Sequence, residues 1–217
     1  MTVAFDPRRL VAQPARETTS AHGEAQAILY ALGVGVSHAG AASPEALRHA
    51  VGPQLSVLPT MAVVMAWPGF WMMEPQYGVD WKRVLHAEES LQLHAPLPVS
   101  GRMTGRIFIE RIVDKGPAKG SLLYSRRELY DEQQRHLATE RRTTFLRGNG
   151  GAGDAQAQGA DLAGYLPLQD VPQREPDRTV TLTTREDQAL LYRLSGDMNP
   201  LHAGPEGAPS LGVGRPI

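Results

Sequence analysis

The 217-residue sequence contains no cysteine, which excludes disulfide bridges, thiolate metal centres and a cysteine nucleophile. It also has no apolar run near the ~20 residues that a membrane-spanning helix needs, and its N-terminus lacks a secretory signal. Strong charge of either sign is missing too, since the formal net charge is −1. This balance argues against binding to nucleic acid or to an anionic membrane. We therefore expect a soluble, cytoplasmic protein.

Hydrophobic residues make up 41% of the chain, which is enough to build one large or two small cores. Apolar residues at helical spacing predict a helix over residues 22–32. Residues 59–67 are interpreted as a buried helix, with a strand as the competing interpretation. Alternating or β-branched stretches then predict strands, at 91–97, 106–113, 121–131 and 136–146. Helices followed by an antiparallel meander indicate an α+β fold class.

Residues 148–164 consist largely of Gly, Ala, Gln and Asp and offer little to bury, which is typical of a flexible linker. The sequence is also similar to itself across this linker. Gln26–Leu32 and Gln188–Leu194 share five of seven residues at an offset of 162. We therefore predict a first unit over 1–148, a linker over 149–178, and the start of a second, related unit over 179–217.

The second copy carries polar groups after its repeated helix that the first copy lacks. Thr184 is the predicted N-cap of that helix, and Gly196 is placed to end it. Asp197, Asn199 and His202 then follow on a loop. Asp, Asn and Pro are common turn formers, so a simple turn is the alternative. A turn would also bring Asp197 and His202 near one water molecule, a pairing suited to activating water.

The segment Tyr-Arg-Leu-Ser-Gly-Asp-Met-Asn-Pro-Leu-His, residues 192–202, resembles the signature of the MaoC-like, type-2 enoyl-CoA hydratases. The first copy is similar to the N-terminal half of the double hot-dog members, at residues 27–35, 58–64 and 84–91. The resemblance implies a hot-dog fold, an antiparallel sheet wrapped on a central helix. It also places the central helix and sheet of the second copy beyond Ile217, so we expect a double hot-dog whose second copy is incomplete.

The resemblance implies reversible hydration of a trans-2-enoyl-CoA to a (3R)-hydroxyacyl-CoA. Asp197 and His202 match the residues that activate water in that family, and Asn199 matches the Asn that supports the loop. No metal or organic cofactor is implied, because CoA is part of the substrate. The expected partners are acyl-CoA and either a second copy or a complementing subunit. A catalytically inactive acyl-CoA-binding or partner-binding remnant is the alternative function, and an acyl-CoA thioesterase is a weaker one.

Three further groups of residues have an ordinary and a functional interpretation. Six arginines between positions 126 and 147 fit a solvated surface better than a site for CoA phosphates. His86, Glu88, Glu89 and His94 fit a solvated sheet better than a set of ligands. The cluster Trp67, Phe70, Trp71, Met72 and Met73 fits core packing better than the lining of an acyl-chain tunnel.

Overall fold

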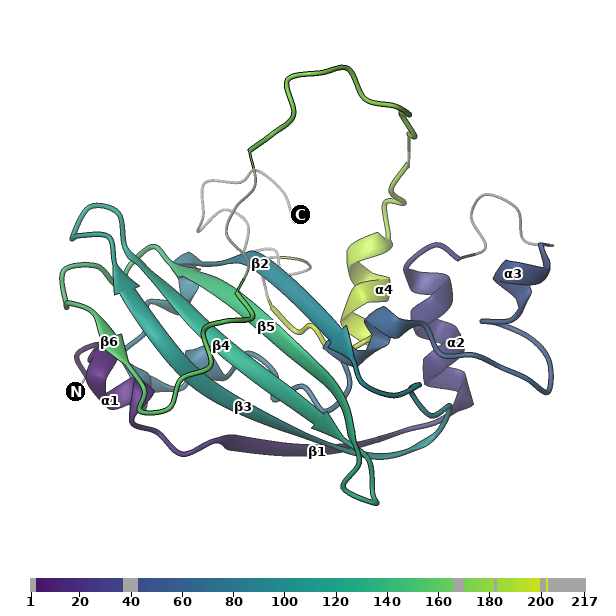
Figure 1. Ribbon diagram of the computed structural model, residues 1–217, viewed down its shortest axis with the longest axis horizontal. Coiled ribbons are helices and arrows are strands. Elements are labelled where there is room, and N and C mark those ends of the chain that lie inside the picture. The colour runs from purple at the N-terminus through teal and green to yellow at the C-terminus, as the bar shows by residue number, and fades with distance from the viewer. Residues whose placement is uncertain (1–2, 37–42, 166–169, 182, 200–201, 203–217) are drawn as a thin grey trace.

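The computed structural model describes residues 3–36, 43–165, 170–181, 183–199 and 202. An antiparallel sheet in the order β1-β3-β4-β5-β2 forms its centre, and a short β6 pairs with β3 (Figure 1). The strands are β1 Arg16–His22, β2 Val84–Leu93, β3 Gly101–Asp114, β4 Ser121–Tyr130, β5 His136–Leu146 and β6 Ala155–Gln156. The α-helices are α1 Pro7–Val11, α2 Glu24–Gly33, α3 Pro44–Leu47 and α4 Gln188–Leu194. Short 3-10 turns are η1 Pro59–Val63, η2 Trp71–Met73, η3 Pro75–Tyr77 and η4 Trp81–Arg83. The α+β class is confirmed.

β4 and β5 lie where the apolar pattern predicts them, and β3 contains the predicted 106–113 but begins earlier, at Gly101. The strand expected over 91–97 is wrong beyond Leu93, because β2 spans Val84–Leu93. β4 and β5 pair along their whole length, from Ser121 opposite Leu146 to Tyr130 opposite His136. The turn between β3 and β4 is closed by the Lys115 N–H, which donates to the Gly120 carbonyl at 2.9 Å. Gly116 and Gly120 both have positive φ there, a conformation that glycine adopts at little cost. Sequence periodicity works here because each strand buries one full face.

Two elements lie in the N-terminal region that has no apolar pattern. α1 begins after Asp6, whose side chain accepts hydrogen bonds from the Arg8 and Arg9 amides, and Pro7 occupies its first position. β1 pairs with β3 at the edge of the sheet. Its residues alternate between half-buried and exposed, and none is a large apolar residue. Strand formation here comes from pairing with β3, which the local sequence does not reveal.

The helix expected over residues 59–67 is wrong beyond its first turn, and so is the competing strand. Only η1 forms, and Ala66 then adopts φ +48°. The side chain of Arg127 donates to the carbonyls of Ala62 and Met65, both at 2.6 Å. The buried Arg127 guanidinium thus donates to two carbonyls that backbone amides would bind in a longer helix. The chain is therefore free to turn sharply before Trp67.

The core lies on one face of the sheet and is divided in two. The first cluster joins α2 and η1 to one end of β4 and β5, and includes Tyr30, Met61 and Leu129. The second joins α1 and η2 to the other end, and includes Leu10, Trp71 and Leu123. α4 lies beside α2 (Figure 1), and the Gln188 side-chain amide donates to the Gly33 carbonyl. The two repeated segments are therefore both helical and are in contact.

The segment after β5 has fixed partners, so the expectation of a flexible linker over residues 148–164 is wrong, although only Asn149 in this range is buried, in keeping with its composition. Asn149 is buried, and its side chain accepts from the Asp80 amide and donates to the Gly78 carbonyl. The Asp114 carboxylate accepts from the amides of Gly151 and Gly153 at 2.9 and 2.7 Å. Small residues are needed here because a Cβ on Gly150 would lie 2.2 Å from the Gly116 carbonyl oxygen.

Among the described helices, none is both long and apolar enough to cross a membrane. The proposed boundaries at residues 148 and 178 remain predictions.

Candidate active site

The loop after α4 is held by contacts between its own residues. Gly196 has φ +111°, as expected for a residue that ends a helix. The Asn199 amide donates to Asp197 Oδ1 at 2.9 Å, and the His202 amide donates to the Asn199 carbonyl at 3.1 Å. Asn199 thus joins the two other predicted site residues through its backbone. Residues 200 and 201 lie outside the described part of the chain.

This loop brings the predicted acid and base together. Asp197 Oδ2 and His202 Nε2 are 3.8 Å apart, and their side chains are 29% and 28% exposed. A separation of 3.8 Å is longer than a direct hydrogen bond. One water oxygen can nevertheless lie about 2.8 Å from both atoms, the usual hydrogen-bond length. The Tyr192 ring lies edge-on to His202, with centroids 6.2 Å apart, and supports the imidazole from the side of α4.

α4 begins later than the sequence predicts. Its first residue is Gln188, and the residue at the cap position is Asp187 with no side-chain capping bond. Thr184 is therefore not the N-cap. The Arg185 guanidinium binds the Asp187 carboxylate at 2.7 Å, so this carboxylate has a partner other than the helix amides. The seven-residue helix is instead positioned by its contact with α2.

The acid and base open onto a cavity of about 370 Å³. One side is formed by Tyr192 and residues 195–199 and 202, and the other by η1, η2, β2, β5 and the turns between them. The apolar lining residues from this second side are Val63, Val64, Trp67, Phe70, Met72, Val84 and Leu85. Trp67, Phe70 and Met72 therefore line the site, which sequence reasoning ranked below core packing. Trp71 and Met72 are both core residues, as core packing predicts, and Met72 also reaches the cavity, whereas Met73 is exposed.

A band of charged side chains separates the two core clusters beneath this cavity. On the core face of the sheet Arg127 is opposite Glu140, between the pairs Leu129–Ala138 and Leu123–Thr144. The Arg127 guanidinium donates to Glu140 Oε2 from Nε at 2.8 Å. Both residues are 3% exposed. A buried pair of this kind needs all its hydrogen bonds satisfied, and here the Ala62 and Met65 carbonyls complete the guanidinium's set.

Arg142 extends the charged band to the cavity wall. Its Nε donates to Glu89 at 2.7 Å and its Nη2 lies 3.1 Å from Glu140. Burial raises the pKa of Glu140, even though Arg127 and Arg142 oppose this. Burial would also raise the pKa of Glu89, but hydrogen bonds from His86 and Glu140 and the charge of Arg142 bring it well below its usual range. The two carboxyl groups therefore favour opposite protonation states.

A β-bulge brings His86 and Glu89 to the same face of β2, which simple alternation along a strand does not predict. The register of β2 against β5 shifts between His86 and Glu88, so His86 is opposite Thr144 and Glu89 is opposite Arg142. Both side chains consequently project from the same face, and His86 Nε2 lies 3.0 Å from the Glu89 carboxylate. The expectation of a solvated sheet surface is wrong for Glu89, whose side chain is only 22% exposed although its strand is at the sheet edge.

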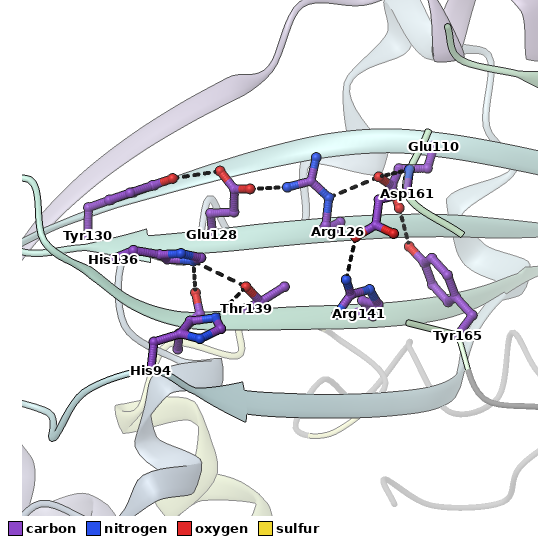
Figure 2. A network of polar contacts seen from close by, with 11 residues as sticks. His94, Glu110, Arg126, Glu128, Tyr130, His136, Thr139, Arg141, Asp161 and Tyr165 are labelled. Atoms are coloured by element: carbon purple, nitrogen blue, oxygen red, sulfur yellow. Dashed lines mark hydrogen bonds and ion pairs between the residues drawn. The ribbon is translucent and has the colours of Figure 1, made fainter. Parts of the chain in front are cut away.

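The expectation of a solvated surface is wrong for four of the six arginines, because Arg126, Arg127, Arg141 and Arg142 are paired and largely buried, whereas Arg135 and Arg147 are exposed. Figure 2 shows Arg126 between Glu110 and Glu128, and Arg141 directed at Asp161. Glu110 is 2% exposed and also accepts from the Tyr165 hydroxyl at 3.0 Å. Arg127 and Arg142 are held in the charged band, and Arg135 binds Asp131 at 3.0 Å, so five of the six arginines bind carboxylates within the chain. This leaves little support for a CoA-phosphate site built on these five residues.

Two sequence families match this chain. Residues 21–148 match the family described as MFE-2 hydratase 2 N-terminal domain, and residues 167–217 match the MaoC like domain. Residues 149–166, which begin with the glycine-rich stretch, lie between the two matched ranges. Each matched range contains one of the two repeated helices.

Known proteins resemble the chain over most of its length. It is 38% identical over 198 residues to peroxisomal multifunctional enzyme type 2 of Drosophila melanogaster, covering 88% of the chain and 32% of that enzyme. It is 33% identical over 224 residues to peroxisomal enoyl-CoA hydratase 2 of Arabidopsis thaliana, covering 98% and 72%. The crystal structure of a MaoC-like dehydratase from Phytophthora capsici superposes with a TM-score of 0.74 at 27% identity, covering 96% and 70%. The chain thus spans about a third of the fly enzyme.

Proposed function

Since the chain belongs to the family of MFE-2 hydratase 2 and MaoC-like proteins, with their hot-dog fold, we propose that it hydrates trans-2-enoyl-CoA reversibly to (3R)-hydroxyacyl-CoA. The observation that carries this proposal is the position of Asp197 and His202. They lie 3.8 Å apart at the wall of a cavity whose other lining is largely apolar. A water held between them would face an acyl chain bound in that cavity.

The proposed step needs one base and one group that orients water. Neutral His202 accepts a proton from water at Nε2 while Asp197 holds the same water through its carboxylate. The water oxygen bonds to C3 of the enoyl thioester, the C2–C3 double bond becomes single, and C2 takes up the proton that His202 accepted from the water, which returns His202 to its neutral form. One water is thereby added with no other reactant. The reverse sequence removes it, and CoA enters and leaves as part of the substrate.

The cavity lining supports a thioester with an acyl chain as the substrate. Eight apolar side chains contribute to the wall, seven of them from the side of the sheet and its turns, and a cavity of about 370 Å³ is within the usual range for small-molecule sites. The polar groups are concentrated at the loop with Asp197 and His202, and at Arg142 and His86 on the sheet side. This separation suits a ligand with one reactive polar end and one apolar end.

The test is hydration of crotonyl-CoA by the purified chain, followed as loss of the ultraviolet absorbance of the conjugated thioester. We expect turnover by the natural sequence, and a loss of about 10²–10⁴-fold in kcat for Asp197→Asn and for His202→Ala. Asp187→Asn, a change of an exposed carboxylate at the start of α4, serves as the matched control and should keep full activity. Turnover that survives both site substitutions would refute the assignment. Binding of acyl-CoA without turnover would favour the inactive acyl-CoA-binding alternative.

A further inference from the structure

Trp67 forms part of the cavity wall although it belongs to the unit that carries no acid–base pair. It lines the cavity together with Phe70 and Met72 and faces the same space as Asp197 and His202. The volume of about 370 Å³ is near the lower end of small-molecule sites. A large ring at the wall of a small cavity occupies space that a longer ligand would need.

The Trp67 ring is held by two guanidinium groups. The Arg142 guanidinium carbon lies 4.1 Å from the ring centroid, and that of Arg127 lies 5.7 Å away. Both are within the range in which a cation is attracted to an aromatic face. Glu89 and Glu140 bind Arg142 in turn, at 2.7 and 3.1 Å. The ring therefore lies against guanidinium groups that are themselves held by several hydrogen bonds, and it has little freedom to move aside.

The backbone before Trp67 is fixed in a conformation that alanine rarely adopts. Ala66 has φ +48°, a left-handed conformation that is unfavourable for a residue with a Cβ. Its amide donates to Ser20 Oγ at 3.0 Å. A Cβ on Gly105 would lie 2.6 Å from the Ala66 carbonyl oxygen, so β3 packs directly on this turn. Strain maintained by contacts of this kind is often found at functional sites.

We propose that Trp67 determines acyl-chain specificity: its ring closes the acyl cavity and limits the length of chain that the site accepts. The inference rests on the proposed function, because it takes the ligand of this cavity to be an acyl-CoA. Arg142 is the positioning residue for the ring. It acts through its planar guanidinium, and a lysine at this position would keep the charge but lose the stacking surface.

The experiment measures two quantities for each variant. The first is kcat/KM for trans-2-enoyl-CoA substrates with four, eight and twelve acyl carbons. The second is the dissociation constant for butyryl-CoA and dodecanoyl-CoA, which are saturated and cannot be hydrated. The variants are Trp67→Ala, Trp67→Phe and Arg142→Lys. Trp81→Phe is the matched control, because Trp81 is not among the residues that line the cavity.

For Trp67→Ala we expect the ratio of kcat/KM for the long-chain substrate to that for the short-chain substrate to rise at least about tenfold. The ratio of the two acyl-CoA affinities should rise by the same factor. A change of this size is typical when an apolar pocket gains room for one methylene group or more. Trp67→Phe and Arg142→Lys should shift the ratio in the same direction by less, and Trp81→Phe should leave it unchanged. Unchanged ratios in Trp67→Ala, or in Trp67→Phe if Trp67→Ala does not fold, would overturn the proposal. If the natural chain has no turnover, the proposed function fails and the affinity ratios alone decide this inference.

Discussion

The Glu140 carboxyl group is almost completely buried, and its shifted pKa predicts how the stability of the fold depends on pH. Burial raises its pKa to about 7, above the value of 4.5 expected in an unfolded chain. The folded protein therefore binds more protons than the unfolded one between these two pH values. The contribution of Glu140 to stability is fully present below pH 4.5 and is lost as the pH rises toward 7. Glu89 acts in the opposite sense, and its contribution is lost as the pH falls from 4.5 toward 2.

We expect Glu140→Gln, which cannot ionise, to flatten the dependence of Tm on pH between 5 and 7.5. One unit of pKa shift corresponds to about 1.4 kcal/mol, so the natural chain should lose a few degrees more than the variant over this range. Thermal unfolding at several pH values measures this, with Glu88→Gln on the exposed part of β2 as the control. Parallel curves for the natural chain and Glu140→Gln would show that Glu140 is already ionised in the folded protein.

The residues of the site differ in how far the sequence revealed them. Asp197, Asn199 and His202 form one short segment, so a local motif was enough to single them out as candidates. Trp67, Arg142 and Glu89 come from separate elements and meet only through the pairing of β2 with β5 and the turn after η1. A β-bulge and a positive φ at Ala66 position two of these three. Neither feature has a signal in a single sequence, because both depend on tertiary contacts.

At the scale of elements, β3 and the turn after η1 approach each other so closely at Gly105 that no side chain fits there. Gly105→Ala would place a methyl group 2.6 Å from the Ala66 carbonyl oxygen. We expect this variant to lose about 1–3 kcal/mol of stability, the usual effect of overpacking. Gly33→Ala is the control, since a Cβ there would contact nothing within 4 Å. Denaturant unfolding of both variants measures the difference, and equal stabilities would contradict the close packing at Gly105.

The elements themselves were predictable in proportion to the apolar surface that they bury. β4 and β5 bury one face along the sheet, and their bounds agree with the sequence pattern to within a residue. β1 buries no large apolar residue and was missed. The helix over 59–67 was overestimated, because Arg127 bonds to the carbonyls of Ala62 and Met65 and replaces helical hydrogen bonding. Local propensity gives no indication of a partner 62 to 65 residues away.

At the scale of the whole molecule, the segment over 148–165 is attached to the sheet by reciprocal bonds at one residue. Asp114 accepts from the amides of Gly116, Gly151 and Gly153, and its own amide donates to the Asp154 carboxylate at 2.8 Å. We expect Asp114→Ala to release this segment and to increase the rate of proteolytic cleavage within it severalfold. Asp170→Ala, at an exposed carboxylate, is the control. Cleavage of Asp114→Ala at the rate of the natural chain would show that the segment is held without Asp114, by β6 pairing and the contacts of Asn149, Asp161 and Tyr165.

The most direct measurement for the central claim is the position of the oxygen label after trans-2-enoyl-CoA is incubated with the chain in ¹⁸O-labelled water. The account predicts one ¹⁸O on C3 of an intact hydroxyacyl-CoA, with the (3R) configuration, and none when Asp197 and His202 are both substituted. Label in a free carboxylic acid with release of CoA would indicate thioester hydrolysis instead. That result, a (3S) product, or label at C3 that persists in the double variant would contradict the account.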